Sequence, residues 1–340
     1  MELVVSGGID TGPWRTVISI FMFHERAFGP GIEEMRFEGR DIVSIRDFTR
    51  EEIEHVIETA RLMEPLTKRG TTMLQGRTLA TLFFEPSTRT RMSFESAMQK
   101  LGGNCIGIAE ARSSSVEKGE SLADTVRTVE NYADLLVLRH QLDGSARMAA
   151  EMASVPIINA GSGAGEHPTQ AMLDLYTIQR EVGRIDGLSV AIVGDLRYGR
   201  TVHSLAYGLA NYDTSIYFVS PDSLRVRREV IDEVGKRVRV HETSKLEDII
   251  PKADVLYMTR IQKERIPDPE EYEKVKGAYR ITADTLRGAR DKMIVMHPLP
   301  RVDEIAAEVD MTSNAKYFKQ MWYGLVTRMA LLALCLGAVE

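Results

Sequence analysis

The segment Ser87-Thr88-Arg89-Thr90-Arg91 combines hydroxyl and guanidinium side chains. Both kinds of side chain bind anions. The apolar run 79–84 before them has the length of a buried strand, and residues 94–101 after them carry apolar side chains at helical spacing. A helix N-terminus offers unpaired N–H groups and the positive end of its dipole, to which these side chains add charge-assisted hydrogen bonds. The pattern predicts a phosphate-binding turn. An ordinary N-cap with surface arginines is the alternative for a single such pair.

Three more candidate side chains follow later strands of the sequence. Arg139 comes directly after the apolar residues 135–138, at the end of a strand, where open α/β sheets place ligand groups. His167 and Gln170 are three residues apart at the start of a helix expected from Pro168, so both lie on one face. A surface arginine or a structural histidine is the commoner explanation of either residue by itself.

Two further segments follow apolar runs of the second half of the chain. Residues 194–201, Gly-Asp-Leu-Arg-Tyr-Gly-Arg-Thr, nearly match the P-loop pattern, with Arg200 in place of lysine. A nucleotide hydrolase is therefore an alternative function, weakened by the missing lysine and by the lack of a clear strand-terminal aspartate for Mg²⁺. Arg260 and Gln262 follow the strand 254–258 and offer a guanidinium fork and an amide donor, which suit a carboxylate.

The elements that must position these residues alternate between strand and helix from Ile42 onward. Expected elements include a helix from the capping box Thr49–Glu52 to Met63, a strand over 104–109, a helix over 121–133 and a second capping box over 244–247. Strand and helix alternate again from Leu188, as they would in a second doubly wound sheet.

Composition limits the functions that this chain can have. A chain of 340 residues is expected to form two domains, and its 44% hydrophobic and 27% charged residues are those of a globular protein. The net charge of −6 gives no general attraction to nucleic acid. With only Cys105 and Cys335, neither a disulfide framework nor a paired-cysteine metal site is expected, which favours a reducing cytoplasm.

Neither end of the chain predicts a membrane segment. The apolar run 325–339 contains Arg328 and is shorter than a membrane span, so a buried helix is expected there. Residues 1–34 are expected to be an extension without an assigned function, and their apolar run 17–23 is too short for a signal peptide. An additional edge strand or a contact with a neighbouring subunit is the alternative for this extension.

The motifs together resemble those of the aspartate and ornithine carbamoyltransferase family. The resemblance covers residues 35–340 and rests on motifs in the family's order, among them F-F-E-P-S-T-R-T-R-x-S-F-E from Phe83, H-P-T-Q from His167 and H-P-L-P-R from His297. It implies an α/β fold of two doubly wound parallel-sheet domains joined by crossing helices, with the active site in the interdomain cleft. The carbamoyl-phosphate-binding domain would be 35–168, completed by the C-terminal helix 325–340, and the aspartate-binding domain 169–324.

The resemblance also implies a role for each candidate residue. The phosphate would be held by Ser87, Thr88, Arg89, Thr90 and Arg139, together with Ser114 and Lys118 of a neighbouring subunit. Thr90, Arg139 and His167 would polarise the carbonyl oxygen, while Gln170 and the carbonyls of Pro298 and Leu299 would orient the carbamoyl amine. Arg200, Arg260 and Gln262 would bind aspartate, and the Leu299–Pro300 bond is expected to be cis.

The implied reaction transfers a carbamoyl group from carbamoyl phosphate to L-aspartate in pyrimidine synthesis, without a cofactor or a metal ion. Two arginines at the second substrate favour a dicarboxylate over cationic ornithine, although another transcarbamoylase such as the ornithine enzyme remains the alternative. The resemblance further implies a homotrimer with shared sites. The sequence leaves open whether regulatory chains associate, whether kinetics are cooperative and which group accepts the proton of the aspartate amine.

Overall fold

The computed structural model describes residues 36–108 and 118–340. The expected extension over residues 1–34 and the candidate Ser114 lie outside the described residues. From Phe37 onward the described chain alternates between strands and helices, as the hydrophobic pattern predicts, and it carries two separate parallel sheets.

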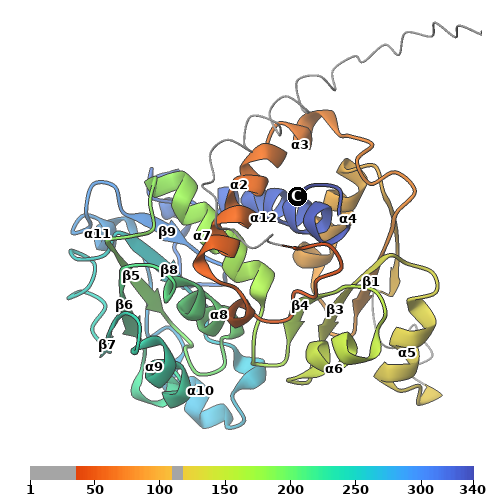
Figure 1. Ribbon diagram of the computed structural model, residues 1–340. Helices are drawn as coiled ribbons and strands as arrows, with labels where there is room; N and C mark the ends of the chain where they lie inside the picture. Colours follow the sequence, from red (N-terminus) through yellow and green to blue (C-terminus); the bar gives the residue numbers. More distant parts are fainter. Residues whose placement is uncertain (1–35, 109–117) are drawn as a thin grey trace, which may run out of the picture. The chain divides into compact units, whose positions relative to one another are not determined.

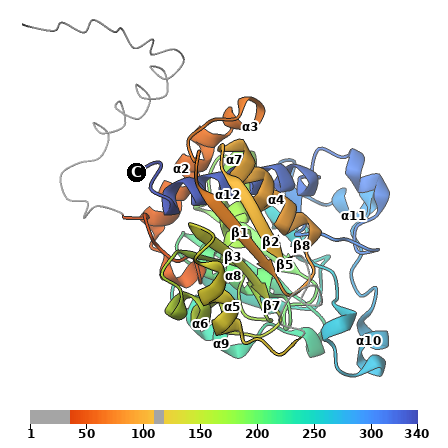
Figure 2. The same cartoon turned by 90° about the vertical axis from the view of Figure 1, so that its right-hand side faces the viewer.

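The first sheet has four parallel strands in the order β2-β1-β3-β4 (Figure 1). Its strands are β1 (Thr78–Phe83), β2 (Asn104–Ile108), β3 (Leu135–His140) and β4 (Ile157–Ser162). Its accompanying helices are α4 (Thr88–Lys100), α5 (Leu122–Val129) and α6 (Ser145–Met152). α4 packs along β1 and β2, as Figure 2 shows, because Phe94, Ala97 and Met98 are buried on its inner face.

The second sheet has five parallel strands in the order β7-β6-β5-β8-β9. Its strands are β5 (Leu188–Val193), β6 (Thr214–Val219), β7 (Arg239–Thr243), β8 (Val255–Met258) and β9 (Ile294–Met296). Its helices are α8 (Arg200–Leu209), α9 (Arg228–Val234), α10 (Pro269–Val275) and α11 (Ala283–Leu286). The expectation of two parallel-sheet α/β domains is therefore confirmed, whereas the exact boundaries between them stay a prediction.

Long helices cross between the two sheets. They are α2 (Arg50–Met63), followed by the short α3 (Leu66–Arg69), then α7 (Pro168–Val182) and α12 (Tyr317–Cys335), and α12 packs against α2, α4 and α7 (Figure 1). α12 begins eight residues before the expected Leu325. Its first turns carry the polar Gln320, which is fully buried and bonded to α7, so the apolar run alone did not show where the helix starts.

Two local expectations are wrong. α5 ends at Val129 and not near Ala133, because the Asn131 amide donates to the carbonyl oxygen of Arg127 at 2.7 Å and satisfies the helix end. No helix follows Ser244, so the expected capping box does not form. Instead, the Thr243 hydroxyl accepts a hydrogen bond from the Lys245 N–H at 3.1 Å, and the chain turns.

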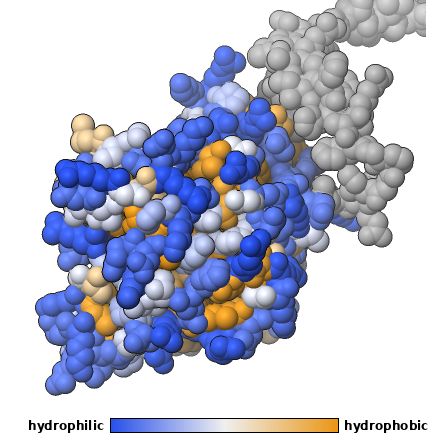
Figure 3. Space-filling model, turned by 90° about the vertical axis from the view of Figure 1, so that its left-hand side faces the viewer, coloured by the Kyte–Doolittle hydropathy of each residue, from blue (hydrophilic) through white to orange (hydrophobic). Residues whose placement is uncertain are grey.

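Polar residues dominate the face shown in Figure 3, and its apolar residues form separate small areas. Across the described ranges 36–108 and 118–340, none of the helices combines the length and the apolar character needed to span a membrane.

The capping box of α2 generates a stability prediction. The Thr49 hydroxyl accepts from the Glu52 N–H, and the Glu52 carboxylate accepts from the Thr49 N–H at 2.8 Å. Thr49→Ala is therefore expected to lower the free energy of unfolding by about 1 kcal/mol, whereas Thr49→Ser retains most of it. Urea unfolding of the three proteins measures the difference. Equal stability of the alanine and serine variants would contradict the cap.

Candidate active site

The carboxyl ends of both sheets open onto one cavity of about 1160 Å³. This is where a doubly wound fold places its ligands. Twelve of the predicted site residues line the cavity: Ser87, Thr88, Arg89, Thr90, Arg139, His167, Gln170, Arg200, Arg260, Gln262, Pro298 and Leu299. Lys118 is exposed and is not among the lining residues. The structure thus brings together residues that are up to 212 positions apart in the sequence, from Ser87 to Leu299.

The predicted phosphate-binding turn stands at the start of α4. Ser87 is the N-cap residue by position, with extended backbone, but its hydroxyl makes no capping hydrogen bond. The side chain therefore does not occupy the first N–H groups of the helix, and these face the cavity with Thr88 and the buried Thr90. Burial, and then the nearby charge of Arg260, lower the pKa of Arg89. The ordinary N-cap of the alternative interpretation is absent at Ser87.

Glu85 is the centre of the charge arrangement in the cavity. Its carboxylate accepts from Arg139 at 2.5 Å and from Arg200 at 2.6 Å, and Arg265 lies 3.9 Å away. Burial would raise the pKa of Glu85, but the three guanidinium groups outweigh it and lower the pKa. Since Glu85 precedes α4 and Arg200 begins α8, this carboxylate joins the two walls of the cavity.

Arg200 lies across the backbone of Gly161. Its guanidinium also donates to the Gly163 carbonyl oxygen at 2.7 Å. A Cβ atom on Gly161, whose φ is +114°, would stand 2.8 Å from the Arg200 Cζ. The glycine-rich exit of β4 therefore leaves space for a buried arginine that comes from the other sheet.

Arg139 and His167 also line the cavity, and little of either side chain is exposed. Burial, and then the charge of Arg200, lower the pKa of Arg139 to about 9. Its Nε is buried and has no hydrogen-bond partner among the described residues, so the group can still donate to a ligand. Burial, followed by the charges of the cavity arginines, holds the pKa of His167 well below its ordinary value. A neutral His167 can donate a hydrogen bond but is a poor acid near pH 7.

The turn after β9 has the expected cis bond between Leu299 and Pro300. His297 is buried, and its Nδ1 accepts from the Leu299 N–H at 2.8 Å. The other ring nitrogen, Nε2, lies 2.6 Å from a carboxylate oxygen of Glu304 and must donate to it. Glu304 thereby fixes the ring that holds the Pro298–Leu299 carbonyls at the cavity.

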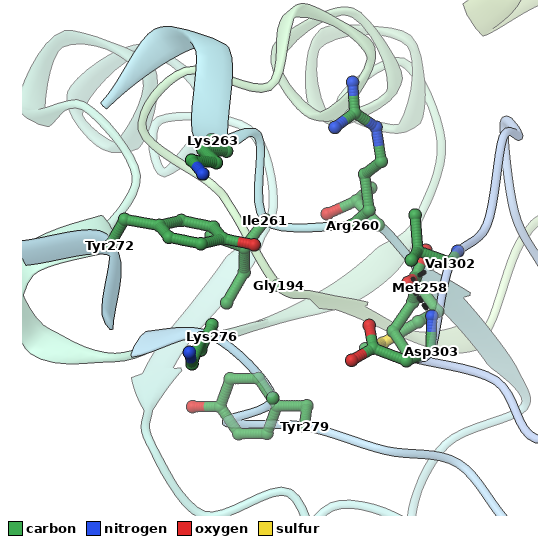
Figure 4. Close-up of a pocket in the computed structure, with 13 residues that line it drawn as sticks. Gly194, Met258, Arg260, Ile261, Lys263, Tyr272, Lys276, Tyr279, Val302 and Asp303 are labelled. Carbon is green, nitrogen blue, oxygen red and sulfur yellow. Dashed lines mark hydrogen bonds between the residues drawn. The ribbon is translucent and has the colours of Figure 1, made fainter. Parts of the chain in front are cut away.

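Arg260 separates the large cavity from a smaller one of about 140 Å³. Figure 4 shows Tyr272, Lys276 and Tyr279 around the smaller cavity, with the Arg260 side chain extending away from them. The Arg260 guanidinium makes a two-pronged contact with Glu264. Both candidate aspartate-binding arginines are thus paired with carboxylates of the protein.

The P-loop alternative does not fit the geometry of residues 194–201. The Asp195 carboxylate is buried within the loop and accepts from the Tyr198 N–H at 3.0 Å, using a donor that a bound phosphate would need. The Arg200 side chain, which stands in place of the P-loop lysine, extends to Glu85 and Gly163. Within the described parts of the chain, no cluster of three or more His, Cys, Asp or Glu residues could hold a metal ion.

Sequence reasoning missed four charged groups of the cavity: Glu85, Glu264, Arg265 and Arg328. Glu85 stands inside the phosphate-binding motif, and Glu264 and Arg265 stand inside the segment after Gln262, so their positions alone could have drawn attention. Arg328 interrupts an otherwise apolar run. Because an arginine is seldom buried unless it is paired, this position could also have drawn attention. It donates to the Ser93 hydroxyl at 3.0 Å and lies over the Phe94 ring.

Two family models match the chain. Residues 40–180 match the model described as "Aspartate/ornithine carbamoyltransferase, carbamoyl-P binding domain". Residues 186–335 match the model described as "Aspartate/ornithine carbamoyltransferase, Asp/Orn binding domain". The two matches cover the first and the second sheet respectively.

Individual relatives agree with these models. The chain is 57% identical over 308 residues to the aspartate carbamoyltransferase catalytic subunit of Thermococcus kodakarensis, covering 90% of this chain and 99% of the relative. It is similar to the solved catalytic subunit of M. jannaschii aspartate transcarbamoylase, with 54% identity, a TM-score of 0.80 and coverage of 86% and 96%. The Trypanosoma cruzi aspartate transcarbamoylase, solved with carbamoyl phosphate and aspartate, has 41% identity, a TM-score of 0.83 and coverage of 88% and 96%.

The contacts of Glu85 with three guanidinium groups predict that a variant without this carboxylate responds to added anions. Glu85→Gln leaves three guanidinium groups without their counter-charge and is expected to lower the free energy of unfolding by about 2 kcal/mol, less than for a fully buried pair. Phosphate should then raise the Tm of the variant more than that of the unmutated protein, because the anion replaces the carboxylate.

Thermal unfolding in phosphate and in chloride at equal ionic strength measures this effect. Glu54→Gln, which breaks an exposed helical pair with Arg50, is the control and should change neither quantity by much. An equal response to phosphate in the unmutated chain and the Glu85 variant would contradict the proposed charge balance.

Proposed function

The chain belongs to the aspartate/ornithine carbamoyltransferase family, and we propose that it is an aspartate carbamoyltransferase catalytic chain. It transfers the carbamoyl group of carbamoyl phosphate to the amino group of L-aspartate, giving N-carbamoyl-L-aspartate and phosphate, the reaction of de novo pyrimidine synthesis. The observation that carries this proposal is the single cavity that joins the phosphate-binding turn of the first sheet to the arginines of the second.

The phosphate of carbamoyl phosphate binds at the start of α4. The free N–H groups of the first turn and the hydroxyls of Ser87, Thr88 and Thr90 donate to its oxygens, and Arg89 supplies charge. Arg139 also contributes once the anion competes with Glu85 for its guanidinium. A phosphate dianion is a stronger partner than one carboxylate, so the exchange is favourable.

The carbonyl group is activated by Arg139, Thr90 and His167. As the aspartate amine attacks the carbonyl carbon, negative charge develops on the carbonyl oxygen and then on the departing phosphate. Fixed donors stabilise both charges without a metal ion or a covalent intermediate. His167 serves as a neutral donor, which agrees with its depressed pKa. The proton released by the amine passes to the phosphate oxygen, since no other base is assigned.

Aspartate is bound by Arg200, Arg260 and Gln262 from the second sheet. Its carboxylates take over the guanidinium contacts that Glu85 and Glu264 make in the free protein. A cationic ornithine side chain would instead meet at least two guanidinium groups in this wall, which disfavours it. The solved T. cruzi relative binds carbamoyl phosphate and aspartate, which supports the same pair of substrates here.

The remaining expectations form part of the proposal. The carbamoyl-phosphate-binding domain is 35–168 with the C-terminal helix, and 169–324 bind aspartate. Ser114 and Lys118 reach the site of a neighbouring subunit in a homotrimer. The proposed sharing of the site is supported by Lys118, which does not line the cavity of its own chain. Both cysteines, Cys105 and Cys335, are free, which is consistent with a cytoplasmic enzyme.

The experiment that tests the function compares second substrates. Purified chain is incubated with carbamoyl phosphate and either L-aspartate or L-ornithine, with a chelator present. Carbamoyl aspartate should form at a high rate and citrulline at a negligible one. Brisk use of ornithine, or loss of activity on chelation, would overturn the assignment.

Arg260→Ala is predicted to affect the two substrates differently. It should raise the KM for aspartate and lower kcat while leaving carbamoyl-phosphate binding nearly intact, because the phosphate groups belong to the first sheet. Loss of a charge-assisted contact to a desolvated carboxylate costs about 2 to 5 kcal/mol. Arg287→Ala, which removes an exposed arginine, is the control. Kinetics with aspartate and calorimetry with carbamoyl phosphate decide, and equal weakening of both substrates would contradict the division of roles.

The shared site predicts complementation. Arg89→Ala and Lys118→Ala should each be nearly inactive, the former by about 100-fold or more. Mixed oligomers of the two variants should regain activity, because some interfaces then combine an intact Arg89 with an intact Lys118. Activity after dissociation and reassembly of the mixture measures this. No recovery in oligomers shown to be mixed would mean that each chain completes its own site.

A further inference from the structure

A chain of buried amides and one carboxylate connects two parts of the site. Asp174, on α7, is fully buried, and its Oδ1 accepts from the Gln170 amide nitrogen at 2.9 Å and from the Gln320 amide nitrogen at 2.6 Å. The Gln320 carbonyl oxygen accepts from the His297 backbone N–H at 3.0 Å. Gln170 lines the cavity, whereas Asp174 and Gln320 do not. This relay of Gln320, Asp174 and Gln170 therefore runs from the turn after β9, through α12 and α7, to the cavity.

The direction of every hydrogen bond in this relay follows from its fixed end. A backbone N–H can only donate, so the Gln320 oxygen must face His297 and its NH₂ must face Asp174. Asp174 Oδ1 is then an acceptor, and the Gln170 NH₂ is held against it. The carbonyl oxygen is the remaining polar group of the Gln170 amide, and Gln170 lines the cavity, so the oxygen is the group left for a ligand there. The other possible orientation of the amide would place NH₂ there.

The directions of these hydrogen bonds do not depend on the charge of Asp174. Burial raises the pKa of Asp174 to about 7, although Tyr257, the two glutamines and the more distant Arg328 oppose the shift. Oδ1 already accepts two N–H groups, so a proton on this carboxyl would occupy Oδ2. Asp174 Oδ2 makes no hydrogen bond of good geometry among the described residues, and the Tyr257 hydroxyl is close enough to lower the pKa of Asp174. Oδ1 thus remains an acceptor in both protonation states.

We propose that Asp174 and Gln320 are positioning residues that hold Gln170 with its carbonyl oxygen toward the substrate, so that the site selects an NH₂ group next to the reacting carbonyl. This inference rests on the proposed function. The same relay fixes His297, whose turn carries the Pro298 and Leu299 carbonyls, so two sets of acceptors for one NH₂ group are oriented together. An acyl phosphate with a methyl group in that place would leave these acceptors unpaired.

Acetyl phosphate is the matched probe, because it replaces the carbamoyl NH₂ with a methyl group and keeps the phosphate. Calorimetry gives the dissociation constants of carbamoyl phosphate and acetyl phosphate for each protein. The unmutated chain should bind carbamoyl phosphate more tightly. Asp174→Leu and Gln320→Leu should weaken carbamoyl phosphate by about 10- to 100-fold, as expected for lost hydrogen bonds, and acetyl phosphate by less than about 3-fold.

Two further variants distinguish the direction of the hydrogen bonds from the charge of Asp174 and from the loss of a buried hydrogen bond elsewhere in α7. Asp174→Asn offers an acceptor at the same place without charge, so its ratio of dissociation constants should stay within about 3-fold of the original. Thr177→Val removes another buried hydrogen bond of α7, to the Leu173 carbonyl oxygen at 2.6 Å, and should leave the ratio unchanged. Gln320→Leu carries the test if Asp174→Leu does not fold.

Equal weakening of both acyl phosphates in the leucine variants would mean a merely structural role and would overturn the inference, as would no change in either. A collapse of the ratio in Asp174→Asn as large as that in Asp174→Leu would also overturn it, because charge and not direction would then be the cause. An unmutated chain that neither binds carbamoyl phosphate nor carbamoylates aspartate would instead overturn the proposed function.

Discussion

The concentration of positive charge in one cavity is the constraint on which the rest of this structure depends. Six arginines line it: Arg89, Arg139, Arg200, Arg260, Arg265 and Arg328. Guanidinium groups at close range repel one another, and burial removes the water that would screen them. The depressed pKa values of Arg139, Arg265 and Arg328 reflect that cost. Glu85 and Glu264 supply counter-charge inside the cavity and offset part of this cost.

The counter-charges also connect the two sheets. Glu85 belongs to the turn before α4, yet it binds Arg200 of α8, and Gly161 leaves the space in which that arginine lies. Substrates with phosphate and carboxylate groups would replace these internal carboxylates one by one. Under the proposed function, binding would exchange anions at guanidinium groups that are already in place, so little reorganisation of the cavity would be needed. The same geometry explains why His167 stays neutral: it lies among cations and away from water.

Behind the arginines that line the cavity lies a buried polar layer in which the direction of each hydrogen bond is fixed. Gln170, Gln320, His297 and Asp174 are buried and bonded to one another, and each bond has one possible direction once the backbone donor is fixed. Buried polar groups are costly unless they are satisfied, so the three hydrogen bonds of this layer favour a single arrangement of its amides. Under the proposed function, charge in the cavity would attract the substrates, while this layer would determine which end of the reacting group each acceptor meets.

The sequence by itself indicated two sets of alternating strands and helices, the predicted phosphate-binding turn and the candidate residues from Ser87 to Gln262, because strand ends and helix starts carry local signals, whereas Pro298 and Leu299 came from the family resemblance. The family resemblance assigned their expected roles. Tertiary structure alone decided that Ser87 makes no cap, that α12 begins at Tyr317 and that no helix follows Ser244. It also revealed Glu85, Glu264 and Asp174 as partners of the site. Their contacts join Glu85 to Arg200 and Asp174 to Gln320, more than a hundred residues apart, and no local pattern encodes a pairing that only tertiary packing creates.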